Sequence, residues 1–288
     1  KAGSCSCGRN VLKELFKESL DKMLRLDGLL QTIGIHRSQR RGLALSGGGA
    51  KGFAHIGVLL AFERFGMKPD VISGVSAGSI AAVLYGAGLT PKEMLECFLE
   101  FGRFSDFTEW AVPKSGFFKL DKFGKILEQW LPVTTLEEMK IPTVICATDF
   151  DHGKSVGWAS GEIVPRVLAS CSIPIVFKPI RINGINYVDG GVLRNLPAWA
   201  IRRHCSTLFG SNCSPLNRHY RFKSSIIDIA IRSYQLTTKA NTLQDLNLCD
   251  YVIQTPKTAE TKVFDISQMR KVALYGYEEA SKVLEKLN

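Results

Sequence analysis

One serine lies in a pentapeptide whose spacing suits nucleophilic catalysis. The sequence Gly74-Val75-Ser76-Ala77-Gly78 follows one apolar run and precedes another. In a tight strand-to-helix turn, a serine hydroxyl is presented at the carboxyl edge of a sheet, and glycines leave room for the neighbouring backbone. Ser76 is therefore a candidate nucleophile for acyl transfer. A serine in front of a helix is also a common N-cap, so the pentapeptide alone supports either role.

A glycine-rich loop follows the first apolar run of the chain and leads into a helical pattern. Consecutive glycines are costly to order, and such loops occur where backbone amides must approach a negative charge. The N-terminus of a helix adds its dipole at the same point. In acyl transfer, this arrangement would stabilise the oxyanion of the tetrahedral intermediate. The residues of the loop are Gly47, Gly48, Gly49, Ala50, Lys51 and Gly52.

The same loop fits a second chemistry. Its glycines match the Gly-x-Gly-x-x-Gly pattern of dinucleotide-binding folds, in which an acidic residue at the end of the second strand binds the ribose. Here the second expected strand ends at the serine pentapeptide, and the nearest acid, Asp70, precedes that strand. A phosphate-binding P-loop does not fit, because Phe53 follows Gly52 where that motif requires lysine. The oxyanion interpretation is the stronger one.

A carboxylate downstream could serve as the base. Asp189 precedes Gly190 and Gly191 and follows a hairpin-like segment at residues 180–187. Taken alone, Asp-Gly-Gly is a common turn. An aspartate with an unperturbed pKa of about 4 is also a weak base. Exclusion of water raises the basicity of a carboxylate, so a catalytic Asp189 would need a dry site.

Histidine is the ordinary base in such enzymes, and a Ser-His-Asp triad is the alternative. A triad of Ser76, Asp189 and a later histidine would follow the chain order of α/β-hydrolases. The candidates are His204 and His219, yet the histidine of that fold follows the last strand, and no histidine occurs after residue 219. His55 falls in the helix after the glycine loop, where we expect a packed or surface role. The sequence favours a Ser–Asp dyad.

Alternating strand and helix patterns surround these motifs. Short apolar runs predict strands at residues 42–45, 71–73, 143–148, 207–209 and 251–254. Helices are expected at residues 50–65, 77–85, 162–169 and 225–238. This alternation predicts an α/β fold of three layers, α/β/α, with a mainly parallel central sheet. The glycine loop and Ser76 should then face each other at one edge of that sheet.

An aromatic insertion interrupts the pattern between residues 90 and 142. Helices expected at residues 91–101 and 121–130 flank a charge-poor loop with five aromatic residues, Phe104, Phe107, Trp110, Phe117 and Phe118. Two interpretations stay open. The insertion could form a lid over the site, or an extra layer with its own small core, since aromatic residues are ordinarily buried.

The first 40 residues are expected to form a separate lead-in. Apolar residues recur at three- and four-residue steps through residues 10–33, with basic residues between them, which predicts one amphipathic helix. That helix could dock on the core or lie on an anionic membrane surface. We therefore divide the chain into residues 1–40 and a catalytic domain at 41–288. Cys5 and Cys7 belong to a lipid-attachment or redox site, or to a leader without structure.

Composition bounds the class of protein. The chain has 288 residues, of which 45% are hydrophobic and 22% charged, as in globular proteins. No apolar run is long enough to span a bilayer. No Cys-x-x-Cys pattern occurs, and Cys146 and Cys171 lie in apolar segments, so free thiols buried in the core are expected in a reducing compartment. We expect a cytoplasmic protein with membrane-surface contact; the first residue is not Met, which leaves export open.

Taken together, three blocks resemble the signature sequences of patatin-like phospholipases. The blocks are residues 47–52, 74–78 and 189–191, in the family's order and spacing. Ser170 with Pro174, and Asn195 with Pro197, also resemble intermediate sequences of the family. The likeness therefore spans about residues 41–196, with Lys51 where many members carry arginine.

The resemblance implies a patatin-like fold, a Ser–Asp dyad, no metal and no other cofactor. It implies hydrolysis of acyl esters in phospholipids or lysophospholipids, with Ser76 attacking the carbonyl and Asp189 accepting its proton. Amides of the glycine loop would hold the oxyanion. The expected partners are a lipid acyl ester and, given the net charge of +10, an anionic membrane surface contacted by residues 10–33 or 218–223. Nucleic acid is not expected, and the oligomeric state is unspecified.

Three other functions compete with this one. Within enzymes, the alternative is an esterase or thioesterase that acts on soluble acyl substrates. From other classes, a dinucleotide-binding oxidoreductase and a catalytically silent lipid-binding relative fit some of the same residues.

Overall fold

The structure, a computed structural model, describes residues 40–100, 106–110, 118–217, 220–221 and 225–287. The helix expected at residues 10–33 lies outside the described residues, as does most of the basic segment 218–223. Five single residues discussed above also lie outside the described residues: Cys5, Cys7, Phe104, Phe117 and His219. The expected boundary at residue 40 stays a prediction.

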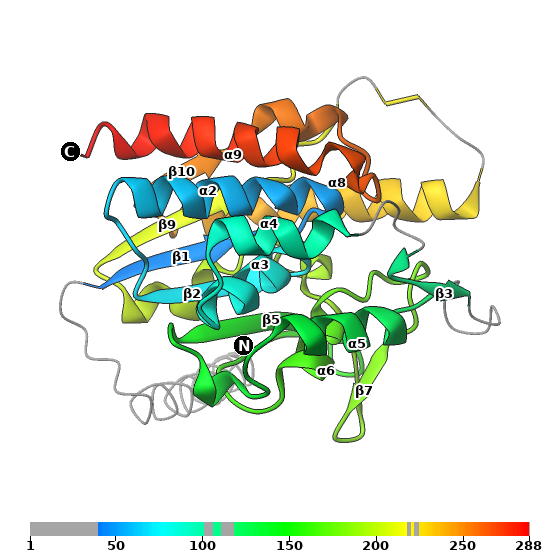
Figure 1. Ribbon diagram of the computed structural model, residues 1–288. Helices are drawn as coiled ribbons and strands as arrows, with labels where there is room; N and C mark the ends of the chain where they lie inside the picture. Colours follow the sequence, from blue (N-terminus) through cyan, green and yellow to red (C-terminus); the bar gives the residue numbers. More distant parts are fainter. Residues whose placement is uncertain (1–39, 101–105, 111–117, 218–219, 222–224, 288) are drawn as a thin grey trace, which may run out of the picture. The chain divides into compact units, whose positions relative to one another are not determined.

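An eight-stranded mixed sheet forms the centre of the fold (Figure 1). Its order is β10-β9-β1-β2-β5-β8-β7, and β6 pairs with β5 off this path. The strands are β1 (Arg41–Leu45), β2 (Val71–Val75), β5 (Thr143–Asp149), β6 (Lys154–Trp158), β7 (Ile180–Ile182), β8 (Ile185–Asp189), β9 (Thr207–Asn212) and β10 (Tyr251–Gln254). Neighbours from β10 to β5 are parallel, whereas β6, β8 and β7 add antiparallel pairs. A separate ladder joins β3 (Glu109–Trp110) to β4 (Phe118–Lys119).

Helices cover the sheet on both faces. The α-helices are α2 (Phe53–Arg64), α3 (Ala77–Gly86), α4 (Pro91–Leu99), α5 (Asp121–Trp130), α6 (Ile163–Ser170), α7 (Ala198–Ile201), α8 (Ile226–Leu246) and α9 (Met269–Leu284). Short 3-10 turns are η1 (Gly49–Gly52), η3 (Leu136–Glu138), η4 (Gly190–Val192), η5 (Arg202–His204), η6 (Pro256–Glu260) and η7 (Ile266–Gln268). The larger core packs α2, α3, α6 and α9 on one face, and the smaller core packs α7 and the end of α8 on the other. The predicted three-layer α/β/α fold with a mainly parallel sheet is confirmed.

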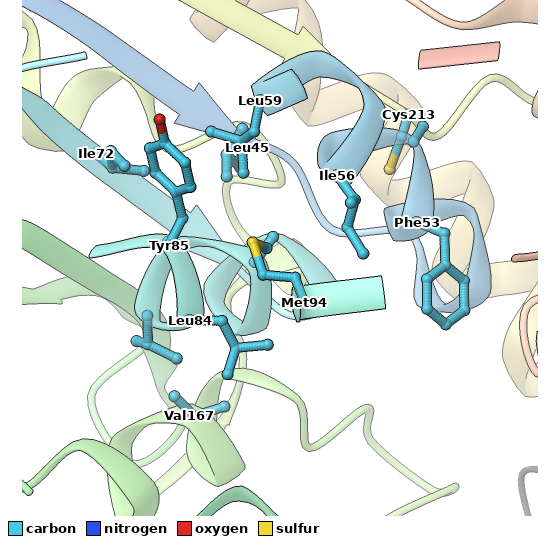
Figure 2. Packing of buried hydrophobic residues seen from close by; sticks show 14 of the residues in the cluster. Leu45, Phe53, Ile56, Leu59, Ile72, Leu84, Tyr85, Met94, Val167 and Cys213 are labelled. Carbon is cyan, nitrogen blue, oxygen red and sulfur yellow. The ribbon is translucent and has the colours of Figure 1, made fainter. Parts of the chain in front are cut away.

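The larger core converges on the face of the sheet that carries α2 and α3. Figure 2 shows Leu84 of α3 and Met94 of α4 pointing toward the space between these helices, with Phe53 at the start of α2. α2 and α9 lie side by side (Figure 1) because glycine lets their backbones meet: a Cβ added to Gly276 would lie 1.9 Å from the carbonyl oxygen of Ala54. No helix of the described residues is long and apolar enough to cross a bilayer.

The parallel strands taken alone follow the order β5-β2-β1-β9-β10, which corresponds to 3-2-1-4-5 in a doubly wound sheet. Dinucleotide-binding folds share that order, so strand order does not separate the two interpretations of the glycine loop. The residues that end β2 must decide between them.

Candidate functional site

Ser76 occupies a strained turn between β2 and α3. Its backbone has φ 52° and ψ −127°, a conformation that costs a non-glycine residue about 1–3 kcal/mol. The Ser76 amide donates to Oγ of Ser170 at 2.8 Å, and that hydroxyl donates to the Cys146 carbonyl at 2.6 Å. On the other side, the amide and hydroxyl of Ser79 donate to the Ser76 carbonyl at 2.8 and 2.6 Å. Two flanking serines thus hold the turn.

The glycines around this turn allow close approach of the backbone. A Cβ on Gly78 would lie 2.2 Å from the Leu45 carbonyl oxygen, and one on Gly74 would lie 2.3 Å from the Gly78 carbonyl oxygen. The end of β1, and with it the glycine loop, can therefore pack directly against the start of α3. This contact brings the loop and Ser76 together.

The glycine loop offers backbone amides beside Ser76. The Gly47 amide donates to the Asn195 carbonyl at 3.1 Å, and the Ala50 amide donates to the Val263 carbonyl at 2.7 Å. Among the described residues, the amides of Gly48 and Gly49 donate to no protein acceptor. Gly49 has φ 58°, and a Cβ there would lie 2.3 Å from the Val263 oxygen. The donors still available in the loop are thus Gly48 and Gly49, whereas Gly47 is already engaged.

Strand register places Ser76 and Asp189 on one row of the sheet. Val75 pairs with Cys146 in the parallel ladder, so the next residue, Ser76, is level with Ala147. Ala147 pairs in turn with Asp189 of the antiparallel strand β8. Paired residues point to the same face of a sheet. The Cα atoms of Ser76 and Asp189 are therefore expected about two strand spacings apart, roughly 9–10 Å. Register therefore brings the end of β2, just before Ser76, and the end of β8, at Asp189, to adjacent positions on either side of β5.

Asp189 is buried and is anchored through one oxygen. Oδ1 accepts hydrogen bonds from the Tyr234 hydroxyl at 2.7 Å and from the Gly191 amide at 2.9 Å. Oδ2 is buried with no hydrogen-bond partner among the described residues. Burial raises the pKa of Asp189 to about 6, while the Ser76 hydroxyl, the Gly191 amide and Tyr234 lower it. Oδ2 is thus the carboxylate oxygen that no described residue holds in place.

Helix α8 clamps the segment that carries Asp189. Besides Tyr234, Asn241 donates to the Gly191 carbonyl at 2.8 Å and accepts from the Asn195 amide at 3.0 Å. Asp245, one helical turn further, receives two hydrogen bonds from the Arg194 guanidinium at 2.9 and 2.6 Å. The helix therefore buries polar groups against residues 189–195 and fixes them relative to the sheet.

An apolar cavity of about 130 Å³ opens beside Ser76. Ser76, Ala77 and Gly49 form one part of its wall. The rest is apolar and includes Phe53, Leu84, Met94, Phe107, Phe123, Ile173, Phe177 and Phe264. A cavity of this character accepts an alkyl chain and excludes water from the serine.

The aromatic insertion does not stand apart from this cavity. Phe98, Phe107, Phe123 and Trp130 form a cluster of edge-on and tilted ring contacts, as an extra core layer would. Phe107 and Phe123 also line the cavity. The described part of the insertion thus contributes aromatic side chains both to a small core and to the cavity wall, and the lid interpretation stays a prediction.

The other residues that the sequence singled out lie outside the dyad. Lys51 is buried and donates through Nζ to the Pro215 carbonyl at 3.1 Å, and burial lowers its pKa. His55 is packed in the core, with ring nitrogens 2.9 Å from Oγ of Ser211 and 2.8 Å from the Ser46 carbonyl. His204 precedes β9 and so lies at the amino edge of the parallel sheet, opposite the edge that carries Ser76.

The described cysteines lie in the two cores or pack against them. The six described cysteines are free thiols, and Cys146 is buried as predicted. Cys171 is half-buried, packs against the larger core as expected, and also lines the cavity.

Sequence reasoning missed the residues that support the dyad from a distance. Tyr234 and Asn241 lie in a helix that was expected to end at residue 238, and Ser79 looked like an ordinary helical residue. The one available signal was the polar character of α8 at helical spacing, with Tyr234, Thr238, Asn241 and Asp245 facing the body of the protein.

Comparisons with known proteins identify the family of this chain. A model of the family described as patatin-like phospholipase matches residues 43–201, more than half of the chain. An uncharacterised NTE family protein of Mycobacterium tuberculosis is 28% identical over 226 residues, which cover 67% of this chain and 59% of that protein. Lysophospholipase NTE1 of Saccharomyces cerevisiae is 30% identical over 186 residues, which cover 62% of this chain and 11% of that protein. The match thus spans about three fifths of the mycobacterial relative and about a tenth of the yeast one.

A solved structure shares the fold. The crystal structure of VipD from Legionella pneumophila aligns with a TM-score of 0.52 and 15% sequence identity, covering 86% of this chain and 67% of that chain. Because β2 ends in a serine turn and not in an acidic residue, and because the family model spans all three sequence blocks, the dinucleotide interpretation is set aside. The chain belongs to the patatin-like phospholipase family.

Proposed function

We propose that this protein is a serine acyl-hydrolase that cleaves acyl esters of phospholipids or lysophospholipids through Ser76 and Asp189. One observation carries the proposal. The strained serine and a buried carboxylate share one row of the sheet, and that serine also lines an apolar cavity. An acyl chain in the cavity would bring its ester carbonyl to the serine hydroxyl.

The state of the carboxylate supports its role as the base. Oδ1 is held by Tyr234 and Gly191, so Oδ2 is the oxygen left to receive a proton. A pKa of about 6 makes Asp189 a stronger base than an exposed aspartate and leaves it ionised near neutral pH. The dry site expected from the sequence is consistent with that burial.

The reaction would proceed in two displacements. Oγ of Ser76 attacks the acyl carbonyl carbon while its proton passes to Oδ2 of Asp189. The intermediate collapses, the ester C–O bond breaks, and the leaving alcohol takes that proton. Asp189 then removes a proton from water, whose oxygen attacks the acyl-enzyme, and the proton returns to Ser76 as the fatty acid leaves.

The oxyanion would be bound by the amides of Gly48 and Gly49. These are the loop amides that have no protein acceptor, and Gly49 lines the same cavity as Ser76. Loss of one such donor typically costs 10²–10³-fold in kcat. The expected contribution of Gly47 is structural, because its amide already binds the Asn195 carbonyl.

A fluorophosphonate probe tests the nucleophile. Covalent labelling should map to Ser76 and should vanish in Ser76→Ala. Asp189→Asn should remain folded and lose most of its labelling rate, because the hydroxyl loses its proton acceptor. A fully active Asp189→Asn protein would refute the dyad.

The substrate class needs a separate measurement. Hydrolysis of vesicular lysophospholipid or phospholipid should greatly exceed hydrolysis of a short soluble ester, because the cavity wall is almost wholly apolar. The opposite ranking would favour an esterase of soluble substrates. No hydrolysis of either, with a folded protein, would favour a silent lipid-binding relative.

A further inference from the structure

A single isoleucine at the edge of the cavity combines two unfavourable features. Ile175 has φ 72°, and its side chain is 53% exposed. A β-branched residue in the left-handed region is a genuine outlier, and such strain costs about 1–3 kcal/mol. The position follows Pro174, and after a turn proline a positive φ is normally taken by glycine or asparagine. The chain thus keeps an apolar, branched side chain in water at a place that would favour a small or polar one.

The neighbours of Ile175 fix it at the edge of the cavity. Ile173 and Phe177 are buried and both line the cavity, and the Phe177 amide donates to the Ile173 carbonyl at 2.9 Å. The next residue, Lys178, donates through its amide to the Phe118 carbonyl at 3.2 Å. We call residues 173–178 the mouth loop. Because both sides of the turn are pinned, the outward direction of Ile175 is a fixed property of the loop.

Exposed lysines accompany the mouth loop, and the acidic residues Asp121, Glu260 and Asp265 lie near two of them in the sequence. Lys178 in the loop is exposed, and so is Lys119 in β4, the strand whose neighbour Phe118 binds the loop. Lys262 is exposed next to Val263, which lines the cavity. An apolar side chain with lysines beside it matches the layered chemistry of a bilayer surface, where acyl chains lie beneath anionic head groups.

We propose that the mouth loop is a lipid-surface anchor, in which Ile175 inserts among acyl chains and Lys178, Lys119 and Lys262 contact anionic head groups. This proposal rests on the proposed function, since the anchored mouth would let an acyl chain pass from the bilayer into the cavity beside Ser76. The strain at Ile175 is then retained because it aims the side chain away from the protein. The occupant is a lipid bilayer and not a second copy of the chain.

Vesicle binding by the full chain tests this directly. In a Ser76→Ala background, which prevents hydrolysis, binding to phosphatidylcholine vesicles with and without phosphatidylglycerol would be measured by sedimentation. Adding Ile175→Asn should weaken binding about tenfold, because roughly half of an isoleucine side chain no longer leaves water. Adding Lys178→Gln should reduce the gain in binding that phosphatidylglycerol provides.

Asparagine is chosen because it tolerates a positive φ, so the variant should unfold at the same temperature as the parent or a higher one. The matched control is Leu274→Asn on α9, a helix that lines no part of the cavity. Leu274 is also 53% exposed, so its replacement removes a similar apolar surface. It should leave vesicle binding unchanged, within about twofold.

Several results would overturn the anchor. These are unchanged vesicle binding in the Ile175→Asn protein, equal losses in the Leu274→Asn control, or a change of oligomeric state that accounts for the loss. Binding that ignores phosphatidylglycerol would remove the role of the lysines. Failure of the anchor can be told apart from failure of the proposed function. With Ser76 intact, the Ile175→Asn protein should hydrolyse a short soluble ester as the parent does. A parent protein that hydrolyses neither lipid nor soluble esters would refute the function alone.

Discussion

Replacing Tyr234 by phenylalanine should move the pH dependence of catalysis to higher pH. The Tyr234 hydroxyl donates to the Asp189 carboxylate at 2.7 Å and lowers the pKa of that group, which burial raises to about 6. A hydrogen bond to a charged group is worth about 1.5–3 kcal/mol, and about 1.4 kcal/mol corresponds to one pKa unit. Its loss should raise the pKa of Asp189 by about 1–2 units, to roughly 7–8.

The direction of the shift in the pH profile follows from the proposed role of Asp189 as the base. Only ionised Asp189 accepts the serine proton, so kcat/KM should fall as pH drops through its pKa in the free enzyme. At pH 6 about half of the parent enzyme is ionised, against roughly a tenth to a hundredth of Tyr234→Phe, which predicts a loss of about 5–50-fold. At pH 9 the two should agree within about threefold.

The assay is kcat/KM between pH 5 and 9 on a short soluble ester, with the released acid quantified by chromatography so that lipid binding does not contribute. Tyr277→Phe on α9 serves as the control, because the Tyr277 hydroxyl contacts Arg64 and not the dyad. An acid limb in Tyr234→Phe that stays near pH 6 would refute the reasoning. A loss that is equal at every pH would point to a purely structural role for Tyr234.

Three further predictions concern the sheet, the dyad and the helix contact. Ala147→Val should lower kcat/KM on the soluble ester by about 10²-fold by wedging Ser76 and Asp189 apart, and unchanged kinetics would contradict the shared row. Asp189→Asn should raise the free energy of unfolding by up to about 3 kcal/mol at pH 8, with the gain vanishing below about pH 4; denaturant titrations that show no such pH dependence would contradict the buried charge. The reason is that the pKa of Asp189 is higher in the folded protein than in the unfolded chain. The protonated carboxyl therefore contributes its full stability below pH 3.8, and this contribution is lost as the pH rises through about 6. Gly276→Ala should cost about 1–3 kcal/mol in thermal unfolding without changing kcat, because its Cβ would strike the Ala54 carbonyl.

The strands and helices that could be predicted from sequence are those with strong, continuous apolar patterns. All five expected strands are present, and β10 has the expected ends. Helix α9 was not anticipated, because its buried face is built largely from Ala273, Gly276 and Ala280, which carry little hydrophobic signal. The antiparallel strand β6 was also not anticipated, since Lys154–Trp158 is only partly buried and alternates weakly.

The chemistry of the site was visible in sequence only where it was local. Ser76 and its glycines share one turn, so their spacing indicated a candidate nucleophile, with a helix N-cap as the alternative. The proximity of Asp189 depends on strand register across β5, which no local pattern encodes. Tyr234 contacts Asp189 from 45 residues away, through a helix whose path the sequence does not specify.

Helix α8 lies outside the sequence blocks that identify the family, yet it holds the segment that carries Asp189. The sequence blocks that define the family lie within residues 43–201, whereas Tyr234 and Asn241, which hold the catalytic segment, lie beyond them. If Asp189 is the base, as proposed, substitutions in that helix would change the pH dependence of activity while every diagnostic motif stays intact. A comparison restricted to the motifs would not reveal such a change.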